Sequence, residues 1–128
     1  MAEAIARSLS DPESDVRFES AGIHALEGAP ATELALRAAA EAGADASGIR
    51  SRPLTPEIVR AADEVYTMTR AHRAALVRLV PEAAARAQVL DPSGADVEDP
   101  YGGSADDYRA ACAHIRGAVE ARMPGWAR

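Results

Sequence analysis

The spacing of apolar residues along the chain, together with residues typical of helix ends, predicts five helices. In the longer helices the apolar side chains recur every three or four residues, so they gather on one face. Thr55 with Pro56 marks one helix start, and Gly43 marks one helix end. The predicted helices span residues 2–9, 31–42, 56–61, 70–79 and 105–122, and a helical turn is expected at 82–86.

Three shorter segments have the composition of strands. Residues 16–20 alternate apolar and polar side chains, residues 65–69 are rich in strand formers, and residues 88–90 form a brief apolar run. Because helices separate these strands, we expect a parallel sheet with helices on both faces. The sequence therefore predicts one α/β domain over residues 1–128, a three-layer sandwich whose small parallel sheet has about three strands.

Composition narrows the class of protein and its location. A formal net charge of −6 argues against nonspecific binding to nucleic acid or to an anionic membrane. No apolar run reaches the length of a bilayer span, and the first residues lack the basic and apolar regions of a secretion signal. The single cysteine, Cys112, excludes an internal disulfide. We therefore expect a cytoplasmic protein.

The stretch 98–104, Glu-Asp-Pro-Tyr-Gly-Gly-Ser, is the strongest candidate for chemistry. Asp99 follows a strand at the carboxyl edge of the expected sheet, where a carboxylate is placed to act as a general acid. Asp-Pro is also common in turns, and on the residues alone the turn explanation is favoured. Tyr101 has two equally weighted interpretations, a ring that stacks on a planar substrate group or a half-buried loop ring. Asp91 begins a second Asp-Pro pair, which lacks the aromatic residue and Gly-Gly-Ser and ranks lower.

Other reactive residue types contribute less. Cys112 lies on the apolar stripe of the last helix, where a free cysteine behaves as a small hydrophobe. His24, His72 and His114 show no metal-ligand spacing, so we expect neither a metal nor a cofactor. No glycine-rich nucleotide fingerprint and no nucleophile elbow occur.

Several segments, taken together, resemble the low-molecular-weight protein tyrosine phosphatase family over nearly the whole chain. The Asp-Pro-aromatic-Gly-Gly-Ser and Ser-Arg-Pro-Leu-Thr segments are most similar to the bacterial branch that includes protein arginine phosphatases. Each piece is short, and the order and spacing of the pieces are specific. The segments are residues 1–5, 20–22, 51–55, 62–63, 68–69 with His72, and 99–104.

The resemblance implies a four-stranded parallel sheet and hydrolysis of phosphorylated protein side chains, phosphotyrosine or phosphoarginine. In that family a Cys-x5-Arg-Ser loop forms a phosphocysteine, and a separate Asp acts as acid and then as base. The implied roles are a general acid/base at Asp99, substrate contacts at Tyr101 and His24, and structural support at Ser20, Gly22 and His72.

The nucleophilic half of that site is missing from the 128 residues. In the family, the cysteine loop and its strand directly precede a Met-Ala-Glu helix, and Met-Ala-Glu begins this chain. We expect a chain truncated at its N-terminus and inactive as given, with unpaired sheet edges that promote association. Either the start lies at an internal Met of a longer, active phosphatase, which we favour, or the chain is a true truncation. The oligomeric state and the choice between tyrosine and arginine are left open.

Two alternatives to an enzyme of this kind remain at this point. A noncatalytic binding or regulatory module could use the same scaffold, with an exposed sheet edge that accepts a strand from a partner. An arsenate reductase on this scaffold would need additional redox cysteines, and only Cys112 is present. We rank the reductase last.

Overall fold

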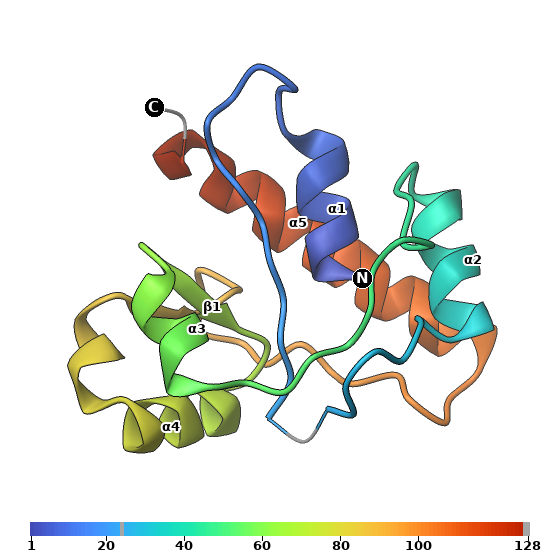
Figure 1. Ribbon diagram of the computed structural model, residues 1–128. Coiled ribbons are helices and arrows are strands. Elements are labelled where there is room, and N and C mark those ends of the chain that lie inside the picture. The colour runs from blue at the N-terminus through green and yellow to red at the C-terminus, as the bar shows by residue number, and fades with distance from the viewer. Residues whose placement is uncertain (24, 127–128) are drawn as a thin grey trace.

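The computed structural model describes residues 1–23 and 25–126, which form helices around a small sheet (Figure 1). All five predicted helices are present, and the predicted helical turn is a 3-10 helix. In chain order the elements are α1 (Ala2–Leu9), α2 (Glu33–Glu41), α3 (Pro56–Ala61), β1 (Val65–Thr67), α4 (Arg70–Leu79), the 3-10 helix η1 (Pro81–Ala85), β2 (Ala87–Val89) and α5 (Ala105–Trp126).

Three threonines fix where helices begin. The Oγ1 atoms of Thr55 and Thr69 accept hydrogen bonds from the third helical N–H of α3 and α4, at 3.2 and 3.0 Å, so both predicted caps are confirmed. Thr32 does the same for α2, at 3.2 Å from the Ala35 nitrogen. Because Thr32 is a cap, α2 begins at Glu33, two residues after the predicted start.

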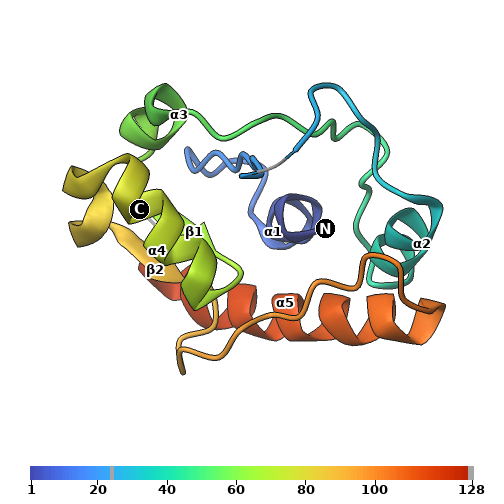
Figure 2. The ribbon, with the colours of Figure 1, turned by 90° about the horizontal axis from the view of Figure 1, so that it is seen from below.

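The sheet contains two parallel strands, with Val65 opposite Ala87 and Thr67 opposite Val89 (Figure 2). The predicted α/β fold class with a small parallel sheet is confirmed. The prediction of a strand at residues 16–20 is wrong, because this segment pairs with no strand in the described part of the chain. Its backbone is extended, and its half-buried Val16 and Phe18 alternate with exposed residues as predicted.

Side chains hold the extended segment in place of a neighbouring strand. Arg7 donates a hydrogen bond from Nη2 to the Phe18 carbonyl at 3.0 Å. Arg52 donates from Nε to the Ser20 carbonyl at 2.9 Å, and its Nη2 lies 3.1 Å from a carboxylate oxygen of Glu19. The segment therefore follows a strand-like path beside α1 without contributing to the sheet.

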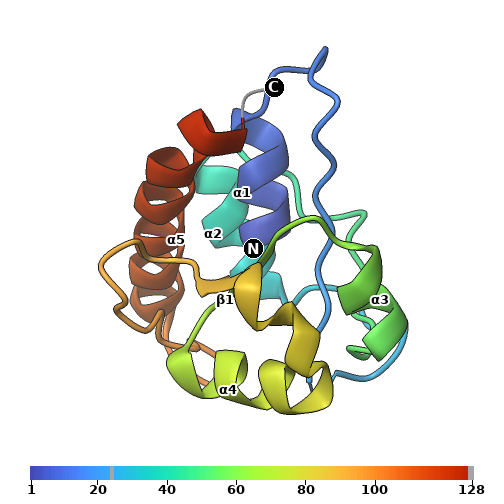
Figure 3. The ribbon, with the colours of Figure 1, turned by 90° about the vertical axis from the view of Figure 1, so that its left-hand side faces the viewer.

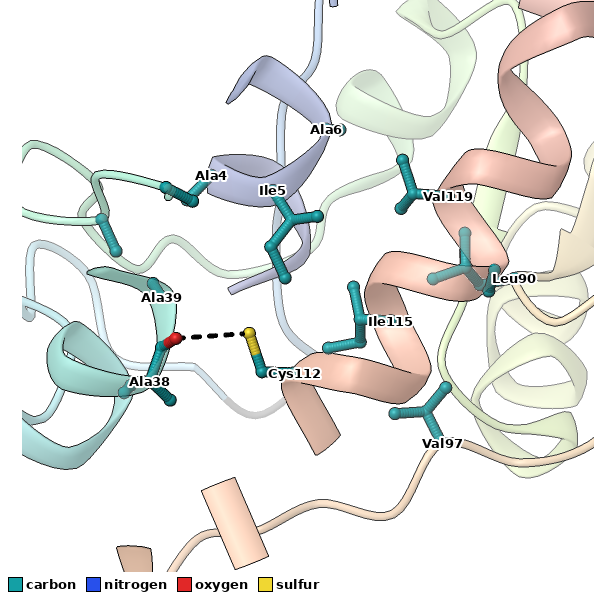
Figure 4. Packing of buried hydrophobic residues seen from close by; sticks show 14 of the residues in the cluster. Ala4, Ile5, Ala6, Ala38, Ala39, Leu90, Val97, Cys112, Ile115 and Val119 are labelled. Atoms are coloured by element: carbon teal, nitrogen blue, oxygen red, sulfur yellow. Dashed lines mark hydrogen bonds between the residues drawn. The ribbon is translucent and has the colours of Figure 1, made fainter. Parts of the chain in front are cut away.

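The core is aliphatic, as the low aromatic content requires, and it has two parts. In the larger part α1 and α2 pack against α5, and Figure 4 shows Ile5 of α1 beside Cys112, Ile115 and Val119 of α5. In the smaller part α4 packs against β1 and β2, and Val59 of α3 and Leu76 of α4 are buried in one cluster. Figure 3 shows α3 and α4 on this side of the molecule. The two parts bracket the sheet with helices.

Arginines donate hydrogen bonds to backbone carbonyl groups at the ends of elements. Arg86 donates to the Val59 and Ala62 carbonyls at the end of α3, at 3.0 and 3.1 Å. Arg122 donates to the carbonyls of Val89 and Leu90 after β2, at 2.8 and 3.0 Å. These long contacts tie each element to one distant in sequence.

The last helix continues past the predicted end near residue 122 to Trp126. The Trp126 ring packs 5.4 Å from the Tyr66 ring and 5.5 Å from the Phe18 ring, centroid to centroid. Its indole N–H donates to the Tyr66 hydroxyl at 3.0 Å. This packing holds the final turn in helical conformation despite Pro124. Among the described residues, no helix has the length and apolarity to cross a bilayer.

Candidate active site

Segments from distant parts of the sequence surround the N-terminal end of α1. In Figure 2, α1 is seen nearly end-on, with α4, α2, the loop before α5 and the loops around residues 25–30 and 50–55 around it. The loop before α5 follows β2, so it leaves the carboxyl edge of the sheet, where ligands bind in parallel α/β folds. This edge is the candidate site.

Asp99 lies on that loop with an exposed side chain. Its Oδ1 accepts a hydrogen bond from the Tyr101 backbone N–H at 3.0 Å, which closes a turn. Its other oxygen, Oδ2, has no hydrogen-bond partner among the described residues. The turn explanation for Asp-Pro is therefore correct, and it leaves one carboxylate oxygen open to solvent.

The residues after Asp99 build a rigid connection to α5. Gly103 N–H donates to the Pro100 carbonyl at 2.8 Å, and Gly102 has a φ of 81°, which favours glycine. A Cβ on Gly103 would lie 2.5 Å from Asp107 Oδ2 and 2.9 Å from the Pro100 oxygen. Glycine is thus required at both positions for different reasons, conformation at the first and space at the second.

The predicted capping box at the start of α5 is confirmed. Asp107 N–H donates to Ser104 Oγ at 3.2 Å, and Ser104 N–H donates to Asp107 Oδ2 at 2.8 Å. The downstream end of the Asp99 loop is therefore fixed to α5.

The side chain of Tyr101, on the same loop as Asp99, is exposed, with 79% of the residue's surface accessible. That exposure excludes the half-buried ring considered from the sequence. An exposed ring beside Asp99 can stack on a planar group bound at this edge.

The predicted supporting residues lie on different segments of the same region. Ser20 Oγ donates to Glu3 Oε1 at 2.7 Å, which joins the extended segment to the first turn of α1. Gly22 N–H donates to the Arg52 carbonyl at 3.0 Å. His72 is exposed in the first turn of α4. No hydrogen bond or ion pair within residues 1–23 and 25–126 joins Asp99 to these three, and His24 lies outside the described residues.

Two further carboxylates, Glu3 and Asp96, make close contacts in this region. Glu3 pairs with Arg7 at 2.8 Å while accepting the Ser20 bond, and its side chain is only 10% exposed. Asp96 Oδ1 accepts the Arg70 backbone N–H at 2.8 Å. Only the Met-Ala-Glu segment of the resemblance gave a signal for Glu3, and no local pattern marks Asp96.

Asp91 has a structural contact of its own. Its Oδ2 lies 2.6 Å from His114 Nε2 on α5, and its Oδ1 accepts from the N–H and hydroxyl of Ser93 at 2.8 and 2.7 Å. These hydrogen bonds, first that of His114, lower the pKa of Asp91 to about 2. The second Asp-Pro pair therefore fixes the start of the loop to α5.

Cys112 is a core residue, as predicted. It is 3% exposed, and its thiol points to the Ala38 carbonyl oxygen 3.6 Å away (Figure 4). Burial raises the pKa of the thiol, which disfavours the thiolate that a nucleophile needs. Within the described residues, no group of three or more His, Cys, Asp or Glu side chains is arranged to hold a metal ion.

A cavity of about 420 Å³ lies at the other end of α1, away from Asp99. It is lined by Arg7 and by residues 10–12, 14 and 16–19, so it runs along the extended segment that lacks a strand partner.

Comparisons with known proteins agree with the architecture. A solved YwlE arginine phosphatase from Geobacillus stearothermophilus superposes with a TM-score of 0.89 and 30% identity, covering 97% of this chain and 81% of that one. Vibrio vulnificus Wzb in complex with benzylphosphonate gives a TM-score of 0.89 at 27% identity, covering 97% of this chain and 87% of that one.

Curated relatives include proteins of two specificities. A low molecular weight protein-tyrosine-phosphatase, Etp of Escherichia coli K12, is 30% identical over 115 residues, 88% of this chain and 75% of that protein. A protein-arginine-phosphatase of Bacillus subtilis 168 is 33% identical over 114 residues, 85% of this chain and 75% of that protein. The family model described as low molecular weight phosphotyrosine protein phosphatase matches residues 1–127. The chain therefore belongs to the low molecular weight phosphotyrosine protein phosphatase family.

Proposed function

We propose that this chain is cytoplasmic and carries the acid/base half of a phosphatase site that acts on phosphotyrosine or phosphoarginine side chains of proteins. The observation that carries the proposal is the Asp99 turn. One carboxylate oxygen holds the Tyr101 N–H at 3.0 Å while the side chain stays exposed at the carboxyl edge of the sheet. A group held in this way can exchange a proton with a bound substrate without losing its position.

The proposed reaction has two steps. A cysteine thiolate attacks phosphorus, the bond from phosphorus to the tyrosine oxygen or arginine nitrogen breaks, and Asp99 gives its proton to that leaving atom. The Asp99 carboxylate then takes a proton from the water that attacks the phosphocysteine, which releases inorganic phosphate and the thiolate. Tyr101 would line the substrate pocket with His24, and Ser20, Gly22 and His72 would support the surrounding loops.

The thiolate must come from outside the 128 residues. Cys112 is buried at 3% exposure and its pKa is raised, so it cannot serve as the nucleophile. We propose that residues 1–128 form one phosphatase-like domain that lacks the family's first strand and Cys-x5-Arg loop and does not turn over substrate alone. The resemblance implies that the family's first strand lies between the segment at residues 16–20 and the strand near residues 65–69. The extended segment at residues 16–20, which has no strand partner among the described residues, supports this proposal.

The same segment favours a second candidate function. Residues 16–19 line the cavity of about 420 Å³ and present backbone groups that no other strand in the described part of the chain pairs with. A noncatalytic binding module could accept a strand from a partner protein there.

The two candidates are tested by comparing the 128-residue chain with a fusion that places the family's strand and Cys-x5-Arg-Ser loop before Met1. We expect hydrolysis of a small aryl phosphate by the fusion only, and a fall in kcat of about 10²- to 10⁴-fold for Asp99→Asn in the fusion. Asp106→Asn, an exposed aspartate of the first turn of α5, is the matched control and should keep its rate.

Three results would count against the proposal. An inactive but folded fusion leaves only the binding module. An active fusion whose rate is unchanged by Asp99→Asn removes Asp99 from the mechanism. Turnover by the 128-residue chain that survives Cys112→Ser and vanishes in Asp99→Asn shows that no added loop is required.

A further inference from the structure

The loop that carries Asp99 is attached to the start of α4 just before the acid. Asp96 Oδ1 accepts the backbone N–H of Arg70, the first residue of α4, at 2.8 Å. The Arg70 guanidinium lies 3.5 Å from the same oxygen. The next residue, Val97, donates its N–H to the Met68 carbonyl at 2.9 Å and is 3% exposed. Adjacent residues of the loop therefore contact both sides of the β1–α4 junction.

The Asp96 contact is favourable for two reasons. The first N–H groups of a helix have no partner within the helix, and here Thr69 accepts that of His72 while Asp96 accepts that of Arg70. A carboxylate at this end is also stabilised by the helix dipole. The side chain of Asp96 is 37% exposed, so little desolvation opposes the contact.

We infer that Asp96 is a positioning residue for Asp99. This inference rests on the proposed acid/base role. Only Val97 and Glu98 separate the two aspartates, and beyond Asp99 the chain is held by the Gly103–Pro100 hydrogen bond and the capping box of Ser104 and Asp107. The loop segment that carries Asp99 is thus fixed to α4 on its upstream side and to α5 on its downstream side. Loss of the Asp96 contact makes the upstream side of this segment more mobile, while the hydrogen bond from Val97 to Met68 still attaches the loop to the end of β1.

The test uses the Tyr101 N–H, because it donates directly to Asp99 Oδ1. Solvent exchange of backbone amides is measured by NMR in the 128-residue chain, in Asp96→Ala and in Asp96→Asn. We expect Asp96→Ala to speed exchange at both Arg70 and Tyr101 by about 5-fold, the factor that corresponds to one net hydrogen bond. Asp96→Asn keeps the acceptor oxygen and should restore most of the protection at both amides.

Core amides of α5 and the control Asp106→Ala separate this effect from general loosening. In Asp96→Ala the core amides of α5 should exchange as in the unsubstituted chain. In Asp106→Ala the amides of Arg70 and Tyr101 should do so. Faster exchange at Arg70 with unchanged exchange at Tyr101 would mean that Asp96 only caps α4, and the inference would be wrong. Equal acceleration of the α5 core amides would overturn it as well.

A second measurement uses the active fusion. Loss of acid positioning should lower kcat/KM for a substrate with a poor leaving group by about 5-fold and leave kcat/KM for a good leaving group unchanged, because kcat/KM reports the first step, in which only the poor leaving group needs the acid. Equal losses for both leaving groups would contradict the inference. If the fusion is inactive, the proposed phosphatase function fails, and the exchange result still decides whether Asp96 holds the Asp99 turn.

Discussion

His114 on α5 and Asp91 after β2 form a contact of 2.6 Å between Nε2 and Oδ2. The two residues lie 23 positions apart in the sequence, and the contact fixes the start of the loop that leads to Asp99. Hydrogen bonds from His114 and from Ser93 favour the ionised carboxylate, so the pKa of Asp91 falls from 3.8 to about 2.

This shift predicts a specific acid sensitivity. Because the pKa is lower in the folded chain, Asp91 stabilises the fold above pH 4, and this contribution is lost as the pH falls from about 4 to about 2. In this window the unfolded chain binds up to about one proton more at Asp91. Urea unfolding at a series of pH values measures this loss. As the pH is lowered through this window, the free energy of unfolding of His114→Gln should fall less steeply than that of the unsubstituted chain. His72→Gln, on the exposed start of α4, should keep the original slope, and an identical slope in both variants would refute the assignment.

We expect Arg122 to contribute more to the free energy of unfolding than the other arginines near the end of the chain. Its guanidinium donates to the Leu90 and Val89 carbonyls and to Gln88, and lies 5.1 Å from the centre of the Tyr66 ring. Lysine cannot make these contacts together. We expect Arg122→Lys to lower the free energy of unfolding by about 1.5–3 kcal/mol.

Denaturant unfolding followed by the fluorescence of Trp126, the one tryptophan of the chain, measures this loss. Arg17→Lys, an exposed arginine on the extended segment, is the control and should change stability by less than about 0.5 kcal/mol. Equal effects of the two substitutions would show that the Arg122 contacts add nothing.

Most of the helices could be predicted because their signals are local. The caps Thr55 and Thr69 and the box of Ser104 and Asp107 involve residues three apart, and the structure has all of them. The segment at residues 16–20 has the alternation of a strand, but a strand also needs a partner, and pairing depends on chain that is distant in sequence. Its exposure pattern was therefore predicted correctly and its pairing was not.

In the candidate site, too, the local features could be predicted from the sequence and the contacts between distant residues could not. The Asp99 turn spans two residues and follows from Asp-Pro chemistry. The contacts of Asp96 with Arg70 and of Glu3 with Ser20 join residues 26 and 17 positions apart, and no spacing rule connects them. Local motifs thus predicted the Asp99 turn, while the contacts that hold its surroundings could be found only from the fold.

Cys112 is predicted to react slowly. Its thiol is 3% exposed and its pKa is raised by burial, so little thiolate is available to a reagent. At pH 8 we expect the folded chain to react with a disulfide reagent more than about ten-fold slower than the chain in denaturant. Comparable rates in the two conditions would mean that the α1–α5 interface opens readily.

Two glycine substitutions near and within α5 should have opposite effects. Gly117 lies exposed inside the helix with no atom within 4 Å of an added Cβ, so Gly117→Ala should raise the free energy of unfolding by about 0.5–1 kcal/mol. Gly103→Ala places a Cβ 2.5 Å from Asp107 Oδ2 and 2.9 Å from the Pro100 oxygen. It should cost about 1–2 kcal/mol through loss of the capping box. Thermal unfolding of both variants measures the difference, and a Gly103→Ala chain as stable as Gly117→Ala would show that the Asp99 loop is not held against α5.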